Sequence, residues 1–90
     1  EGCADRQSAM GKVLSGIGLR CKAKGVTAVA LCGALEDGYE ELYDQGICAC
    51  FTCTRRAAPL DEVLAQAADN LGRAADDLLR LLAALQDPRF

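Results

Sequence analysis

The sequence contains no histidine and no tryptophan. Its aromatic residues are few, namely Tyr39, Tyr43, Phe51 and Phe90. The lack of histidine excludes Ser–His and Cys–His catalysis and imidazole metal sites. The two serines, Ser8 and Ser15, lie in no turn typical of a nucleophile elbow. We therefore expect no enzyme activity, no catalytic residue and no cofactor.

Long apolar runs are also absent. A membrane-spanning helix needs roughly 18 consecutive apolar residues, whereas the longest uncharged stretch, residues 25–35, is interrupted by Thr27 and two glycines. We expect no transmembrane segment. The formal net charge of −3 and the scarcity of aromatic side chains argue against nucleic acid as a partner.

Cysteine, by contrast, is abundant for so short a chain. The six cysteines are Cys3, Cys21, Cys32, Cys48, Cys50 and Cys53. An even number in a short chain that begins at Glu1 is typical of three disulfides in a secreted, extracellular protein, although the pairing stays open. Only Cys50 and Cys53 have the C-x2-C spacing of a zinc site, so we expect no metal. The alternative is a reduced protein whose cysteines are core residues or metal ligands.

The last third of the chain has the strongest periodicity. Its apolar residues recur at heptad spacing: Leu60, Leu64, Ala67, Leu71, Ala74, Leu78, Leu81 and Leu85. This pattern predicts one long amphipathic helix over residues 59–86. Such a helix needs a partner along its length, which is either the first half of the chain or a second copy in a homodimer. The dimer or packing seam would consist of Leu60, Leu64, Leu71, Leu78, Leu81 and Leu85.

The first half of the chain predicts a helical hairpin. Residues 5–24 have an apolar face at helical spacing, and Asp5 is suited to begin this helix while Gly25 is suited to end it. Three glycines within it, Gly11, Gly16 and Gly18, indicate either close helix contact or a disulfide that holds a weak helix. A second apolar stripe predicts a helix over residues 26–45, ended by Gly46.

Residues 47–53 are short, β-prone and rich in cysteine, so we predict an extended connector there. The predicted fold class is all-α: a small disulfide-stapled three-helix bundle with a long C-terminal amphipathic helix. Residues 1–90 would form a single domain. Within it, residues 3–53 form the stapled hairpin and connector, and residues 59–86 form the long helix.

Candidate partner-binding residues lie on the second predicted helix and in the following linker. They are Tyr39, Glu40, Glu41, Tyr43, Arg55 and Arg56. Tyrosine is favoured in interfaces, and the acidic residues here lack the spacing of a calcium-binding loop. We therefore expect a non-catalytic secreted protein, such as a toxin, effector or signalling ligand, that binds an unknown protein target. Two alternatives stay open: a carrier of a small apolar ligand, and a structural protein that self-assembles through the leucine seam.

Overall fold

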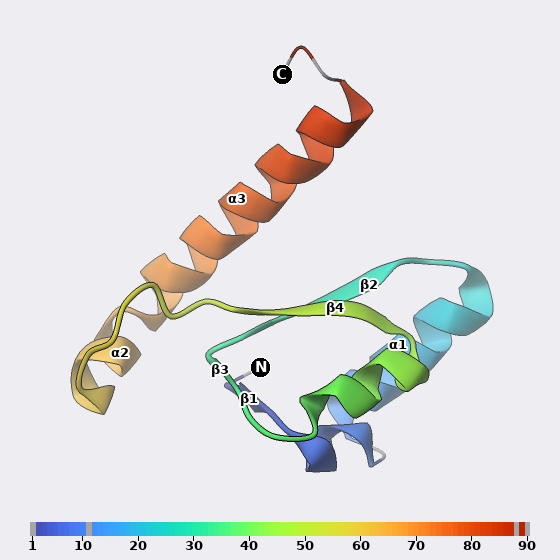
Figure 1. Ribbon diagram of the computed structural model, residues 1–90, viewed down its shortest axis with the longest axis horizontal. Coiled ribbons are helices and arrows are strands. Elements are labelled where there is room, and N and C mark those ends of the chain that lie inside the picture. Colours follow the sequence, from blue (N-terminus) through green and yellow to red (C-terminus); the bar gives the residue numbers. More distant parts are fainter. Residues whose placement is uncertain (1, 11, 88, 90) are drawn as a thin grey trace. The chain divides into compact units, whose positions relative to one another are not determined.

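The computed structural model describes residues 2–10, 12–87 and 89. The chain divides into two compact units, residues 1–52 and residues 53–90 (Figure 1).

Unit 1 alternates strands and helices. Its elements in chain order are β1 (Cys3–Ala4), the 3-10 helix η1 (Arg6–Ala9), α1 (Val13–Lys24), β2 (Ala28–Cys32), β3 (Ala34–Leu35), the 3-10 helix η2 (Tyr39–Gln45) and β4 (Ile47–Thr52). The strands form two parallel pairs, β1 with β3 and β2 with β4. Figure 1 shows β2 and β4 side by side. The unit is therefore mixed α/β, and the all-α prediction is wrong.

The error lies in residues 26–45. The apolar run in this segment satisfies a helical stripe, but a continuous apolar run is also typical of a strand in a parallel sheet. Here β2 pairs with β4 in the register Ala30↔Cys50 and Cys32↔Thr52, with an irregularity between Ala28 and Val29. The extended segment predicted over residues 47–53 thus finds its partner in residues that were predicted to be helical.

The helix predicted over residues 5–24 is interrupted. Asp5 caps the short η1, and α1 begins only at Val13. The end of α1 follows the prediction, because Gly25 adopts a left-handed conformation with φ of 69° and its N–H donates to the carbonyl oxygens of Cys21 and Lys22. Gly46 ends η2 in the same way, with φ of 92°.

The core of unit 1 consists of small and medium-sized side chains. Its buried residues are Ala4, Ala30, Cys32, Leu42 and Ile47. Leu14 of α1 and Tyr39 of η2 are partly buried against this cluster. The core is therefore formed by residues from both strand pairs and from η2, and α1 packs on it.

The predicted disulfides are absent. The structure describes all six cysteines (Cys3, Cys21, Cys32, Cys48, Cys50 and Cys53) and contains no disulfide among them. Cysteine packs well as a small apolar residue, and Cys32 does so in the core, while Cys48 is exposed on β4. The chain is not stapled. The extracellular location stays a prediction, without the disulfides that motivated it.

Unit 2 contains two helices, α2 (Leu60–Ala65) and α3 (Ala67–Gln86). They occupy nearly the residues of the single long helix that the sequence predicts, but Gln66 separates them with φ of −102° and ψ of 7°. Pro59 precedes α2, and Asp61 and Glu62 lie in its first turn, where carboxylates suit the helix dipole.

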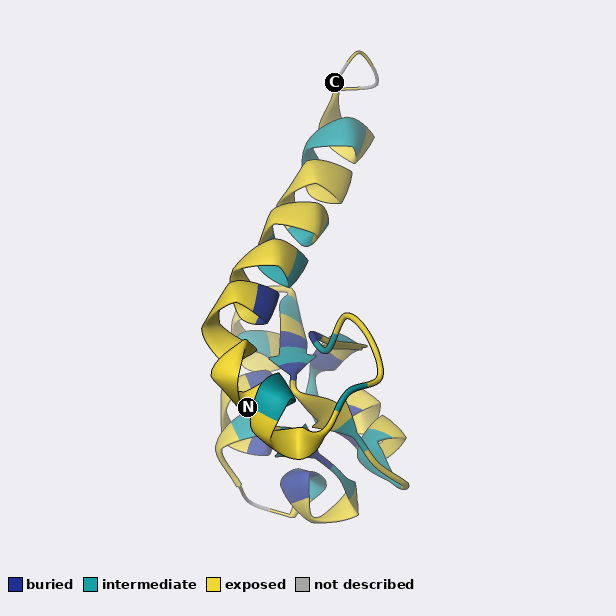
Figure 2. Ribbon diagram, turned by 90° about the vertical axis from the view of Figure 1, so that its left-hand side faces the viewer, coloured by how far each residue is buried: buried dark blue, intermediate teal, exposed yellow. Residues whose placement is uncertain are grey.

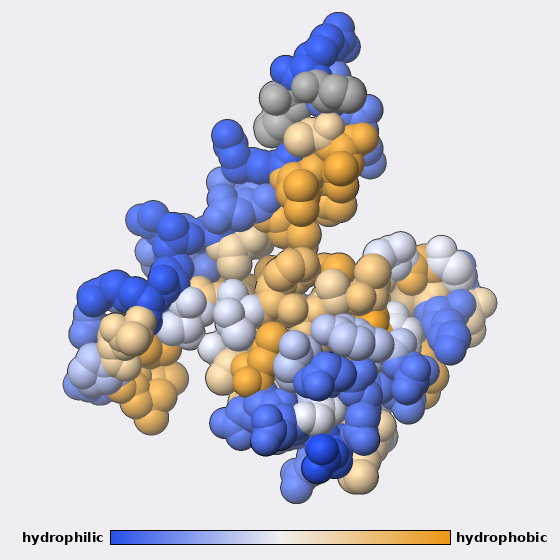
Figure 3. Space-filling model, in the orientation of Figure 1, coloured by the Kyte–Doolittle hydropathy of each residue, from blue (hydrophilic) through white to orange (hydrophobic). Residues whose placement is uncertain are grey.

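The leucine face of unit 2 is largely exposed. Among the described residues of α3, only Asn70 is buried, and Figure 2 shows most of this helix as exposed. The predicted seam residues Leu60, Leu64, Leu71, Leu81 and Leu85 are between 48% and 72% exposed, and Leu78 is half-buried. Figure 3 shows apolar side chains gathered on one side of α3. The homodimer through this seam stays a prediction. Within the described ranges, no helix is long and apolar enough to span a membrane.

Candidate functional site

The strands β1 and β3 end at the same edge of their parallel pair. Ala4 is opposite Leu35, and the N–H of Glu36 donates to the carbonyl oxygen of Ala4 over 2.8 Å. The segments that follow, beginning at Asp5 and Glu36, therefore start side by side. Ligands of open α/β folds bind at the carboxyl ends of their parallel strands. This edge is the first candidate for a functional site in unit 1.

The loop that leaves β1 is held by a pair of polar side chains. The Asp5 carboxylate accepts hydrogen bonds from the backbone N–H of Ser8 over 3.2 Å and from its hydroxyl over 3.4 Å. The Ser8 hydroxyl oxygen in turn accepts from the N–H of Asp5 over 3.1 Å. Ser8 is only 9% exposed. This reciprocal cap fixes the backbone that leads from β1 towards α1.

The start of α1 favours anions. Lys12 is the N-cap residue, its side chain makes no capping hydrogen bond, and the first turn contains no acidic residue. The backbone N–H groups at a helix start carry partial positive charge, and the Lys12 ammonium adds a full one. The Ser15 hydroxyl donates to the Lys12 carbonyl oxygen over 3.0 Å, which fixes the backbone of this turn. The loop after β1 therefore delivers a basic side chain to the positive end of a helix.

The 3-10 helix η2, which follows β3, contacts the same loop. The Arg6 guanidinium lies 3.7 Å from the Glu41 carboxylate. Gly38, with φ of 89°, packs against Arg6 so closely that a Cβ on it would lie 2.5 Å from the Arg6 Cβ. This contact brings the basic start of the chain against its acidic middle and holds η1 beside η2.

The sequence-predicted partner residues fall into two sets. Tyr39, Glu40, Glu41 and Tyr43 all lie on η2 in unit 1. The rings of Tyr39 and Tyr43 meet edge to face with centroids 6.2 Å apart. The pKa of Tyr43 is raised, mainly by desolvation and to a smaller extent by a side-chain hydrogen bond with Tyr39. Tyr39 also packs on the core, so it has a structural role.

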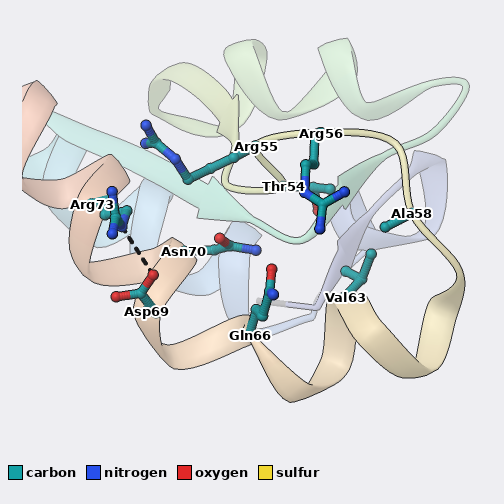
Figure 4. A pocket seen from close by; sticks show the side chains of 9 residues that line it. All are labelled: Thr54, Arg55, Arg56, Ala58, Val63, Gln66, Asp69, Asn70 and Arg73. Carbon is teal, nitrogen blue, oxygen red and sulfur yellow. Dashed lines mark hydrogen bonds and ion pairs between the residues drawn. The ribbon is translucent and has the colours of Figure 1, made fainter.

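Arg55 and Arg56 belong to unit 2, in the linker before α2. Arg55 lies 3.9 Å from the Asp77 carboxylate, and Arg56 pairs with Glu62. Both residues line a pocket of unit 2 (Figure 4). No finding tests whether the two sets bind a protein partner, so this role stays a prediction.

The sequence predicts a helix cap at Asp5 but no functional role for Ser8 or Lys12. A signal for both was present: an acid followed three residues later by a serine, and a Gly-Lys pair directly before an apolar helical face. Asn70 and Arg73, which line the pocket in unit 2, were also missed. Both residues lie between the apolar positions of the heptad pattern, so the pattern gives no indication of a role for them.

Comparison with known proteins shows the family of the chain. Residues 1–83 match the model of the glycerate kinase family. The glycerate kinase of Halalkalibacterium halodurans is 36% identical over 78 residues, which are 87% of this chain and 20% of that protein. The glycerate kinase of Haemophilus influenzae is 34% identical over 83 residues, or 92% of this chain and 22% of that protein. The chain thus spans about a fifth of the length of these relatives. No solved structure matches it.

These matches correct the functional predictions from sequence. The relatives are enzymes by name, so the predicted function is wrong. This applies to the non-catalytic secreted toxin, effector or signalling ligand, and to both alternatives, the carrier of an apolar ligand and the self-assembling structural protein. The expectation of no enzyme activity is overturned for the same reason. That expectation was based on the absence of histidine. This absence excludes some catalytic mechanisms but does not exclude phosphoryl transfer. The chain belongs to the glycerate kinase family.

Proposed function

We propose that this segment is part of an enzyme that phosphorylates glycerate. The observation that carries the proposal is the similarity to glycerate kinases over almost the whole chain. The arrangement of unit 1 is compatible with it, because a capped loop leads from the end of a parallel strand to a basic residue at a helix start. Sites for phosphorylated ligands use this arrangement in other α/β proteins.

The chemistry of the reaction gives the residues of this loop their roles. Glycerate carries a carboxylate and the phosphoryl donor is a polyanion, so the enzyme must hold negative charge close together. Phosphoryl transfer is catalysed chiefly by positioning and by electrostatic stabilisation. In this proposal Lys12 contributes charge to one of the anionic reactants. Asp5 and Ser8 are positioning residues that fix the loop before it.

Kinases commonly use a divalent cation to neutralise the transferred phosphate. Within the part of the chain that the structure describes, no group of three or more acidic or cysteine side chains could hold such an ion. The described residues alone do not fit a metal site.

A chimeric enzyme tests the proposal. Residues 1–83 would replace the matching segment of the Halalkalibacterium halodurans glycerate kinase, and glycerate-dependent consumption of ATP would be measured. We expect the chimera to be active. Lys12→Gln should then lower kcat/KM by about tenfold or more, since it removes one positive charge from an anion site.

Lys24→Gln is the matched control, because Lys24 lies in the last turn of the same helix. It should leave the activity unchanged. A chimera with native-like circular dichroism and thermal melting, but without activity that depends on glycerate, would contradict the proposed function. Equal effects of the two lysine substitutions would contradict the role of Lys12 alone.

A further inference from the structure

The strand β2 has the composition of a strand with a neighbour on both sides. Its five residues are apolar, and the stretch 25–35 around it contains no charged residue and no proline. Strands at the edge of a sheet are normally protected by charges, prolines or bulges, because an open edge pairs with other chains. Within the described residues, β2 and β4 form a sheet of two strands. The edge of β2 that lies away from β4, over Ala28–Ala30, is therefore a candidate interaction surface.

β4 has the protection that β2 lacks. Ala28 is opposite Ile47 and Val29 is opposite Ala49, so β4 has one residue more than β2 at this step. Irregularities of this kind are common in edge strands, which they bend and twist. β4 thus suits the outer position of a parallel sheet, and β2 suits a position inside it.

One face of the sheet is also incomplete. Ala30 and Cys32 belong to the core, whereas Val29 is 40% exposed and Phe51 is 42% exposed. Phe51 is opposite Leu31, and Leu31 lies two residues from Val29, so these apolar side chains share the other face. Parallel sheets are generally buried on both faces. The pair of strands is therefore part of a larger sheet, and the chain spans only about a fifth of its relatives' length.

The register of β1 indicates which segment lies beside β2. β1 runs parallel to β3 with Cys3 opposite Ala34, and only Gly33 separates β3 from β2. The two backbones are still in contact one step earlier. The N–H of Ala34 donates to the carbonyl oxygen of Gly2 over 3.0 Å, and a Cβ on Gly33 would lie 2.6 Å from that oxygen. A chain that continues backwards from Gly2 in this direction therefore runs along β2.

The edge that such a continuation occupies follows from β4. β4 takes up one edge of β2 from Ala28 to Cys32, so a segment before β1 can pair only with the opposite edge. Because Cys3 is opposite Ala34, the partner of each residue lies 31 positions earlier in the chain. In this register, Ala28–Ala30 are opposite the second to fourth residues before Glu1. β1 itself has only two residues, and the continuation gives it the usual length of a strand.

We propose that β2 is the middle strand of a parallel sheet with the order β1–β2–β4 in the whole enzyme. The residues that precede Glu1 in the full-length kinase continue β1 backwards and pair with the edge of β2 over Ala28–Ala30. This segment is apolar, because parallel sheets are buried on both faces, and it contains no proline, because proline lacks the N–H that the pairing needs. The proposal uses the family and the strand register, and it does not depend on the role of Lys12.

An extension of the 90-residue chain tests this proposal. The glycerate kinase of Bacillus cereus matches all 90 residues at 27% identity, and about ten residues that precede the matched part of that protein would be added before Glu1. We expect NMR contacts between the second to fourth residues before Glu1 and residues 28–30, in the parallel register. Alternate N–H groups of β2 point to the new strand, so at least one amide within 28–30 should exchange about tenfold or more slowly. A control extension of glycine and serine should produce neither effect.

Proline at both the second and the third residue before Glu1 separates pairing from mere attachment. One of these two N–H groups points towards β2, so the double substitution should remove the contacts and the slow exchange. Proline at the ninth and tenth residues is the matched control and should change neither. An extension that behaves like the glycine and serine control, or that pairs antiparallel to β2, would overturn the proposal. So would contacts at this edge in the unextended chain that increase with protein concentration, because they would assign the edge to a second copy.

The chimeric kinase provides the same test if the 90-residue chain does not fold alone. Hydrogen exchange followed by mass spectrometry should show slow exchange both in residues 28–30 and in the segment before residue 1. The two prolines beside residues 28–30 should accelerate exchange in both segments. Unchanged exchange in residues 28–30 would overturn the proposal, whatever the activity of the chimera.

Discussion

The backbones of Gly18 and Gly46 are in direct contact. A Cβ on Gly46 would overlap the carbonyl oxygen of Gly18, and a Cβ on Gly18 would overlap the carbonyl oxygen of Gln45. The contact fixes the middle of α1 against the turn between η2 and β4. Of the three glycines that weaken the predicted first helix, Gly18 thus has a packing reason, Gly16 has open space around it, and Gly11 lies outside the described residues.

Gly18→Ala should therefore destabilise the chain by about 2–4 kcal/mol, because neither backbone can move away from the added methyl group. Urea unfolding followed by circular dichroism measures the change. Gly16→Ala is the matched control two residues earlier in the same helix. It should stabilise the chain by up to about 1 kcal/mol through helix propensity. Similar effects of the two substitutions would show that the contact does not exist.

The cap between Asp5 and Ser8 gives a second prediction. Asp5→Ala removes the acceptor of two hydrogen bonds from Ser8, and it should cost about 1 kcal/mol in the free energy of unfolding. Asp5→Asn keeps an acceptor oxygen and should lose less than half of that. If both variants unfold at the wild-type urea concentration, the loop is not held by this side chain.

The same cap links structure to activity in the chimeric kinase. Ser8→Ala leaves Lys12 intact but removes the hydroxyl that accepts from Asp5 and donates to it. We expect activity to fall because the loop before Lys12 loosens, and Ser8→Thr, which keeps the hydroxyl, should recover part of it. Loss of activity in Ser8→Ala with full recovery in Ser8→Cys would instead indicate that only the side-chain volume matters.

Thiol reactivity distinguishes the cysteines of β4. Burial raises the pKa of the Cys50 thiol, so at pH 8 a smaller fraction of it is the reactive thiolate than for an unperturbed cysteine. Cys48, two residues earlier on the same strand, is exposed and lies at the irregularity where Ala28 is opposite Ile47 and Val29 is opposite Ala49. Alkylation of the folded chain by iodoacetamide, followed by mass spectrometry, should modify Cys48 well before Cys50. The difference should disappear in urea. Equal rates in the folded chain would contradict the placement of Cys50.

Local signals in the sequence predicted the parts of the fold that depend on neighbouring residues. Gly25 and Gly46 end their elements in the left-handed conformation expected of them. Residues 47–52 are extended, and the heptad pattern of the last third corresponds to α2 and α3. These features are set by backbone preference and by periodicity, both of which can be read from a short window of sequence.

The parts that failed depend on distant residues. β2 is a strand because it pairs with β4, which lies fifteen or more residues later in the chain. A short window of sequence around β2 does not include β4. The cysteines imitate a disulfide framework, although cysteine also serves as a small core residue. The candidate site follows from the pairing of β1 with β3, which brings Asp5 beside Glu36. Without that pairing, Lys12 is one more exposed basic residue.

The parallel pairing of β2 with β4 is the central structural claim, and cross-strand proton contacts in the NMR spectrum of the 90-residue chain test it most directly. The account predicts contacts between the backbone protons of residues 29–32 and those of residues 49–52, in the register Ala30↔Cys50, with no helical contacts between residues three apart in 28–32. Helical contacts through residues 28–32, or a disulfide between any two cysteines of the folded chain, would contradict it.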